Sequence, residues 1–130
     1  MFDRDHFIEG CMNAVADGQG AIREVVAEAV SDSVGVMSEL GEPQHAGITP
    51  IFRSRDLTIL NFVWAPCMSL MPHNHQMFSV VGIYSGREDK VFWRRAGPTS
   101  RQPGPNLQWS AKWLHSVATL SILYLILLAK

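Results

Sequence analysis

The chain has few cysteines and no excess of either charge. Its 130 residues include two cysteines, Cys11 and Cys67, which are far apart and form no CxxC pair. This usage argues against a disulfide framework and favours a reducing compartment, so we expect a cytoplasmic protein. The formal net charge is −1, and without a basic excess we expect no nucleic-acid partner.

Long apolar runs and targeting signals are also missing. The N-terminus lacks the basic start and apolar stretch of a signal peptide. The continuous apolar run at residues 120–129 is only half as long as the roughly 20 residues that a spanning helix needs. We therefore expect this run to form a buried final strand, with no membrane contact. A C-terminal tail anchor is the alternative.

The composition is that of one globular domain covering residues 1–130, because hydrophobic residues make up 47% and charged residues 18% of the chain. Residues 1–42 form a predicted helical lead-in, since apolar residues recur at helical spacing in two stripes, separated by the break at residues 17–20. Residues 31–33 are a predicted cap for a short third helix, which ends before residues 41–43.

From residue 47 the pattern changes to short strands. We predict strands at residues 48–52, 57–64, 71–75, 78–84, 90–95, 107–117 and 120–129. Several short strands after a helical segment favour an antiparallel sandwich or barrel over residues 47–130. A small barrel encloses a pocket that can hold one ligand or metal.

Two histidines lie between the most strand-like segments of the chain. His73 and His75 are separated by one residue, so in a strand both side chains would point to the same face. Two neutral imidazoles that converge in this way form half of a transition-metal site. Alternatively, they are unrelated surface histidines near a turn.

The spacing of these histidines resembles the two motifs of the cupin superfamily. The first motif, G-x5-H-x-H-x(3,4)-E-x6-G, is met in part by His73, His75 and Gly86, although its Glu is missing. The second motif, G-x5-P-x-G-x2-H-x3-N, is met in spacing by Gly104 and His115, while its other positions differ. The resemblance implies a mainly β fold, the cupin double-stranded β-helix, after an N-terminal helical segment.

Three histidines without the Glu resemble the thiol dioxygenase branch of the cupins, especially its small bacterial cysteine dioxygenase-type members. That resemblance implies iron(II) held by His73, His75 and His115, and oxidation of a small thiol by O2 to a sulfinic acid. Nickel, zinc and copper also suit three imidazoles. The resemblance to the thiol dioxygenase branch also implies that Arg53 pairs with a substrate carboxylate, an interaction that the planar guanidinium favours. Otherwise Arg53 and Arg55 are ordinary surface charges.

Three further residues are weaker candidates for a role in the site. Cys67 precedes His73, whereas the crosslinking Cys of related enzymes follows the His pair, so we expect no thioether cofactor and assign Cys67 to a turn or the core. Glu88 lies too many residues after His75 to be the Glu of the first cupin motif, and we expect it to form a salt bridge. His45 has no assigned role.

After His115 the chain departs from the family pattern. The family's Asn-Pro turn is missing, and Tyr124 is offset from the family's Tyr, so we expect an aberrant or truncated C-terminal end. Three hypotheses therefore stay open: an iron-dependent thiol dioxygenase, a non-catalytic metal- or ligand-binding cupin, and a structural barrel. An open barrel edge also makes a homodimer possible.

Overall fold

The structure, a computed structural model, describes residues 1–69, 78–88 and 120–127. The described residues begin with three α-helices and a short 3-10 turn, followed by four strands. The helices are α1 (Arg4–Ala14), α2 (Gln19–Ser31) and α3 (Ser33–Leu40), with the 3-10 turn at Val15–Asp17. The strands are β1 (Gly47–Arg53), β2 (Leu57–Trp64), β3 (Phe78–Ser85) and β4 (Leu120–Leu127).

The four strands form an antiparallel sheet in the order β1-β2-β4-β3. The last strand of the sequence is therefore an inner strand, paired with β2 on one side and β3 on the other. Leu120 lies opposite Trp64 of β2, and Leu127 lies opposite both Leu57 of β2 and Phe78 of β3. This arrangement confirms a strand at residues 120–127, although that strand lies inside the sheet rather than at the end of a barrel.

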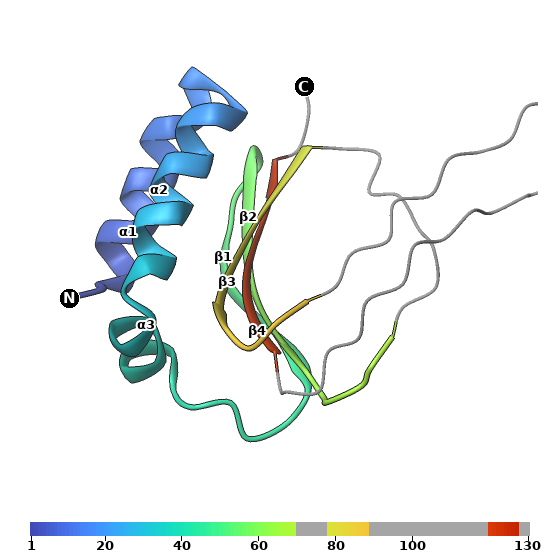
Figure 1. The fold of residues 1–130 in the computed structure, drawn as a ribbon. Helices are drawn as coiled ribbons and strands as arrows, with labels where there is room; N and C mark the ends of the chain where they lie inside the picture. Colours follow the sequence, from blue (N-terminus) through green and yellow to red (C-terminus); the bar gives the residue numbers. More distant parts are fainter. Residues whose placement is uncertain (70–77, 89–119, 128–130) are drawn as a thin grey trace, which may run out of the picture.

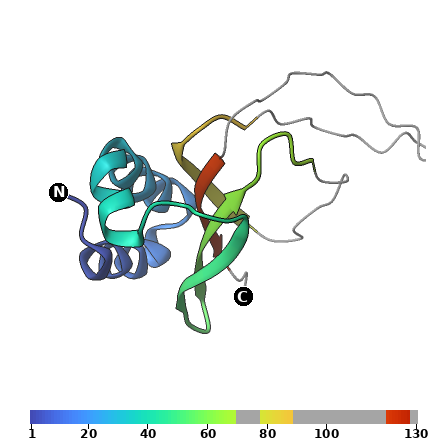
Figure 2. The same ribbon diagram turned by 90° about the horizontal axis from the view of Figure 1, so that it is seen from below.

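The helices cover one face of the sheet (Figures 1 and 2). Their apolar stripes and the alternate residues of the strands meet in one core, in which Ile22, Val36 and Ile59 are fully buried. The close approach of α2 to β3 depends on Gly82, since a Cβ there would lie 2.5 Å from Val26 Cγ1 and 2.7 Å from Val30 Cγ1. The remaining buried hydrophobic members of the core are Phe7, Cys11, Ala14, Val26, Ala29, Leu57, Val80 and Tyr84.

The prediction of a mainly β fold, a cupin double-stranded β-helix built as an antiparallel barrel or sandwich, is wrong. The described residues instead form a two-layer α+β arrangement, with helices of 11, 13 and 8 residues against strands of 7 or 8 residues. The physical reason is that the helices supply much of the core. They form one of the two layers and are not a lead-in to a barrel.

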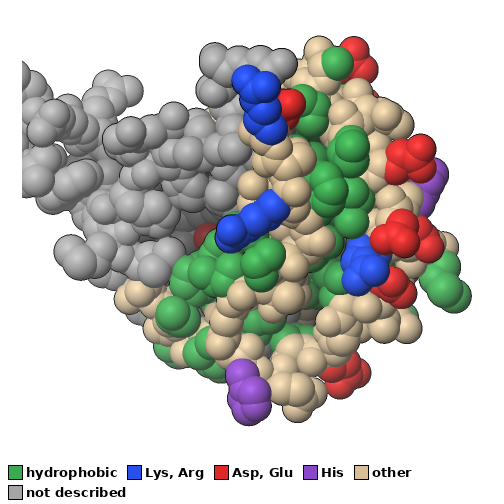
Figure 3. Space-filling view, turned by 180° about the vertical axis from the view of Figure 1, so that it is seen from behind, with side chains coloured by type: hydrophobic (Ala, Val, Ile, Leu, Met, Phe, Trp, Pro, Cys, Tyr) green, Lys and Arg blue, Asp and Glu red, His purple; other side chains and the backbone are tan. Residues whose placement is uncertain are grey.

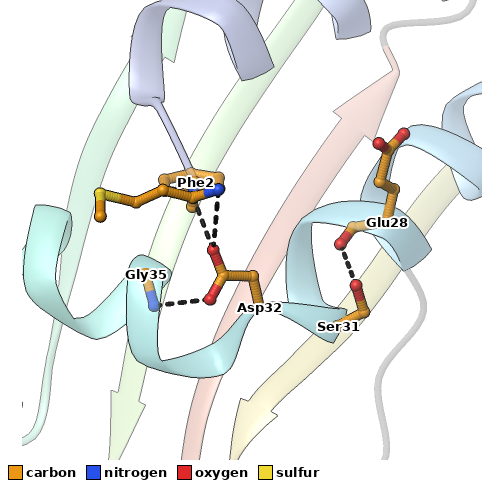
Figure 4. Close-up of polar contacts among 6 residues, drawn as sticks. Phe2, Glu28, Ser31, Asp32 and Gly35 are labelled. Atoms are coloured by element: carbon orange, nitrogen blue, oxygen red, sulfur yellow. Dashed lines mark hydrogen bonds and ion pairs between the residues drawn. The ribbon is translucent and has the colours of Figure 1, made fainter.

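Asp32 fixes the junction between α2 and α3 (Figure 4). Its carboxylate accepts hydrogen bonds from the backbone N–H of Gly35 at 2.9 Å and of Phe2 at 2.7 Å. These two bonds, in that order, lower the pKa of Asp32 below its usual value. Asp32 is the N-cap of α3, so the cap predicted at residues 31–33 is confirmed. A Cβ at Gly35 would collide with the Asp32 carboxylate.

The predicted strands at residues 48–52, 57–64 and 78–84 are confirmed with small changes at their ends. The helix break predicted at residues 17–20 is found at Gly18, which adopts a φ of 90° that glycine tolerates best, whereas Gln19 and Gly20 already belong to α2. The strands predicted at residues 71–75, 90–95 and 107–117 lie outside the described residues.

No helix in the part of the chain that the structure describes is both long enough and apolar enough to cross a membrane.

Candidate functional site

The face of the sheet opposite the helices is apolar on β2. Successive side chains of a strand point to opposite faces. Leu57 and Ile59 face the helical core, so Thr58, Leu60 and Phe62 belong to the other face. Leu60 is only 8% exposed although it is outside the helical core cluster. We call the surface formed by Thr58, Leu60, Phe62 and Trp64 the β2 outer face.

Two aromatic rings lie next to each other on the β2 outer face. The rings of Phe62 and Trp64 are stacked, with centroids 5.7 Å apart and an interplanar angle of 15°. Both residues are half-buried. Such rings present a rigid apolar surface against which an aliphatic substrate can pack.

Arg53 ends β1 and lies opposite Thr58 in the register, which places it on the same side of the sheet as the β2 outer face. Its side chain is exposed, and it forms no ion pair or hydrogen bond with any residue that the structure describes. The guanidinium is therefore available to an external carboxylate. Figure 3, which shows the molecule from behind, has Arg side chains next to hydrophobic ones on the side where β1 forms the edge of the sheet.

The three predicted metal ligands His73, His75 and His115 lie outside the described residues, so the structure places only Arg53 of the predicted site. Two described anchor points nevertheless limit where the histidines can meet. His75 is three residues before Phe78, the start of β3, and His115 is five residues before Leu120, the start of β4.

These anchors lie at opposite ends of the sheet, because β3 and β4 are antiparallel. An eight-residue strand separates its ends by about 23 Å. The two tethers span at most about 10 Å and about 17 Å when fully extended. Together these two reaches exceed the separation of the anchors, so the anchor positions are compatible with a metal shared by the three histidines.

The other potential ligands in the described residues are scattered. His6 and His45 are both exposed. Within residues 1–69, 78–88 and 120–127, no three His, Cys, Asp or Glu side chains gather as a metal site would require. The prediction of iron(II) thus depends on histidines whose positions are not described.

Cys67 is in a turn after β2, as predicted, and its φ of 60° is unusual for a residue other than glycine. Cys11 is fully buried among apolar neighbours, and this burial raises the pKa of its thiol to about 12. Cys11 is therefore a core residue rather than a nucleophile. Glu88 is half-buried shortly after the turn at Gly86.

A buried polar pair was not predicted from the sequence. The hydroxyl of Tyr84 donates a hydrogen bond of 2.9 Å to Asn61 Oδ1, and the two residues are only 5% and 8% exposed. Tyr84 is on β3 and Asn61 on β2, so the bond passes over β4 on the helical side of the sheet. The signal in the sequence was a single Asn inside the apolar run at residues 57–64.

Comparisons with known proteins complete the description of the site. The chain matches no protein-family model, and searches among curated proteins and solved structures find no similar protein.

Proposed function

We propose that the protein binds a divalent metal, iron(II) in the first place, through His73, His75 and His115, and uses it to oxidise a small thiol with O2 to a sulfinic acid. The observation that carries the proposal is the position of Arg53. Its exposed guanidinium, which has no partner among the described residues, lies on the sheet face that also presents the stacked rings of Phe62 and Trp64. This combination suits a short organic molecule with a carboxylate at one end.

Arg53 is the residue that would orient the substrate. Its planar fork can hold both oxygens of a carboxylate. With the carboxylate fixed at the end of β1, the rest of a small substrate extends over the β2 outer face. The half-buried rings of Phe62 and Trp64 reduce the water around the thiol, which helps to exclude side reactions.

The three imidazoles form a neutral donor set that suits iron(II), and the same set accepts nickel, zinc or copper. Bound iron would hold the thiolate and O2 together, which removes much of the entropic barrier to forming S–O bonds. Both oxygen atoms end on the sulfur, so one thiol and one O2 give one sulfinic acid and no other reductant is needed.

A second candidate is a metal-binding or small-ligand-binding module without catalysis. The degraded motif around Gly104 and His115, and the departure from the family pattern after His115, favour this reading. Loss of the groups that orient metal ligands lowers both metal affinity and activity. The two candidates share a metal site and differ in whether O2 is consumed.

We place the protein in the cytoplasm. The cysteines Cys11 and Cys67 are not joined in a disulfide, as expected in a reducing compartment. A small thiol would be kept reduced there, and so would be available as a substrate.

The first test is the metal content of the full chain, purified without chelators, together with His115→Ala and the matched control His45→Ala. We expect near-stoichiometric iron in the parent and in the control, because His45 is an exposed residue before β1, and a large loss in His115→Ala. Unchanged iron in His115→Ala would remove His115 from the site. No metal in any of the three proteins would contradict the oxidation proposal and metal binding alike, and would leave only the small-ligand form of the second candidate.

The second test measures O2 consumption with two small thiols, one that carries a carboxylate and one that does not. Arg53→Gln should raise the KM about tenfold for the carboxylate thiol only, since a charge-assisted bidentate contact is lost. The matched control is Arg55→Gln, in the exposed turn between β1 and β2. O2 uptake that is absent with an iron-loaded protein would leave the non-catalytic candidate.

A further inference from the structure

A groove lies between α2 and β3, away from the β2 outer face. It has a volume of about 630 Å³ and is open to solvent along one side. Its walls include Gln19, Arg23 and Val30 from α2 and Ser79, Val81 and Ile83 from β3. We call it the α2–β3 groove.

One wall of the α2–β3 groove is a strand edge. Among the described strands, β3 pairs with β4 and with no other. The carbonyl of Ser79 accepts a hydrogen bond of 3.3 Å from Gln19 Nε2, so this carbonyl points away from β4. The N–H and C=O of one residue in an antiparallel strand point to the same side, and this side repeats at every second residue. The backbone groups of Val81 and Ile83 therefore also point outward.

The opposite wall has one charged residue. Arg23 is exposed and forms no ion pair or hydrogen bond with the residues that the structure describes. On α2 it lies between Gln19, which bonds to Ser79, and Val26, which contacts Gly82. Arg23 is thus beside the middle of the β3 edge.

Charge decides between the possible occupants of the α2–β3 groove. A second copy pairing β3 against β3 around a two-fold axis at its centre would bring two Arg23 side chains together, and like charges repel. The chain's own residues 90–95 include Lys90, Arg94 and Arg95 and no acidic residue, so they are also mismatched with Arg23. An acidic strand is matched.

We propose that the α2–β3 groove binds an extended acidic segment of another protein, which adds as a further strand to the edge of β3 that no described strand occupies, and places a carboxylate against Arg23. Main-chain hydrogen bonds to the edge supply affinity in this type of recognition, and side-chain contacts supply specificity. The apolar residues Val30 and Ile83 would contact the alternate side chains of the segment. Ile83 is 36% exposed and so is accessible to them.

The test uses fluorescent peptides of alternating Val and Thr with a central Glu, and follows binding to the full chain by anisotropy. A second peptide has Lys in place of Glu, and a third keeps Glu but is N-methylated at alternate amides. We expect binding of the first peptide, about tenfold weaker binding of the Lys peptide, and loss of binding on N-methylation, because the added strand can no longer donate to β3.

Two protein variants complete the test. Arg23→Glu should weaken binding of the Glu peptide and strengthen binding of the Lys peptide, each by about tenfold. The matched control Arg55→Glu should leave the binding of both peptides unchanged. Circular dichroism confirms that the variants are folded. The proposal is overturned if neither peptide binds, if the Lys peptide binds equally well, or if binding survives N-methylation. It is also overturned if the protein self-associates through this edge and the association excludes the peptide.

Discussion

The two faces of the sheet use the same strands for different purposes. The helical face is packed, with Ile59 fully buried and Gly82 in close contact with two valines, and its polar pair Tyr84–Asn61 is satisfied internally. The opposite face has Arg53, which forms no ion pair with the residues that the structure describes, and a stacked aromatic pair at Phe62 and Trp64. Stability is therefore expected to depend on the first face and ligand binding on the second.

The largest expected effect separates the two faces directly. Ile59→Ala on the helical side should lower the free energy of unfolding by about 2–5 kcal/mol, because it leaves a cavity in a fully buried site. Phe62→Ala on the half-buried outer face should lower the free energy of unfolding by a smaller amount. Urea unfolding of both variants measures the difference, and equal losses would show that the two faces contribute alike to stability.

The next effect tests how closely α2 lies against β3. Gly82→Ala should lower stability by about 1–3 kcal/mol, because its Cβ would overlap Val26 and Val30. Gly47→Ala in β1 is the matched control, since nothing lies within 4 Å of a Cβ there. Thermal unfolding compares them, and a similar Tm for both variants would argue against the close packing.

A smaller effect is expected from the buried polar pair. Tyr84→Phe removes the donor and leaves Asn61 Oδ1 without this bond, which should cost about 1–3 kcal/mol. Replacing both residues, as in Tyr84→Phe with Asn61→Val, should recover part of that loss. If the loss of stability in the double variant equals the sum of the losses in Tyr84→Phe and Asn61→Val, the pair is not acting as a coupled unit.

The smallest effect concerns Asp32 and pH. Its pKa is lowered in the folded protein by the N–H groups of Gly35 and Phe2, so its carboxylate stabilises the fold above the ordinary value of 3.8. This contribution is lost as the pH falls through the lowered pKa. Asp32→Asn should therefore reduce the fall in Tm on acidification, relative to the control Asp56→Asn. An unchanged pH profile would contradict the cap's role.

Local features of the fold were predictable from the sequence. Alternation and turn residues gave the strands at residues 57–64 and 78–84, and helical spacing gave buried Phe7 and Cys11, although Met12 from the same stripe is 51% exposed. Asp32 was predictable as a cap, because short acidic side chains accept from the first free N–H groups of a helix.

The architecture was not predictable in the same way. An apolar stripe shows that a helix buries one side but not what it packs against, so the sequence pattern is the same for a lead-in to a barrel and for a layer packed on a sheet. The insertion of β4 between β2 and β3 depends on pairings between residues far apart in sequence. Of the predicted site, Arg53 could be placed on a face of the sheet, whereas the histidines remain a prediction.

The position of β4 also bears on how the chain folds during synthesis. The helices and the β1–β2 hairpin leave the ribosome first and can pack by local contacts. The pairing of β2 and of β3 with β4 can form only after β4, the last strand in the sequence, has been synthesised. Non-local pairing of this kind slows folding and leaves strand edges exposed to other chains in the meantime. A nascent chain that stalls before Leu120 would therefore have its helical layer but no strand that connects β2 to β3, and we expect it to be prone to aggregation.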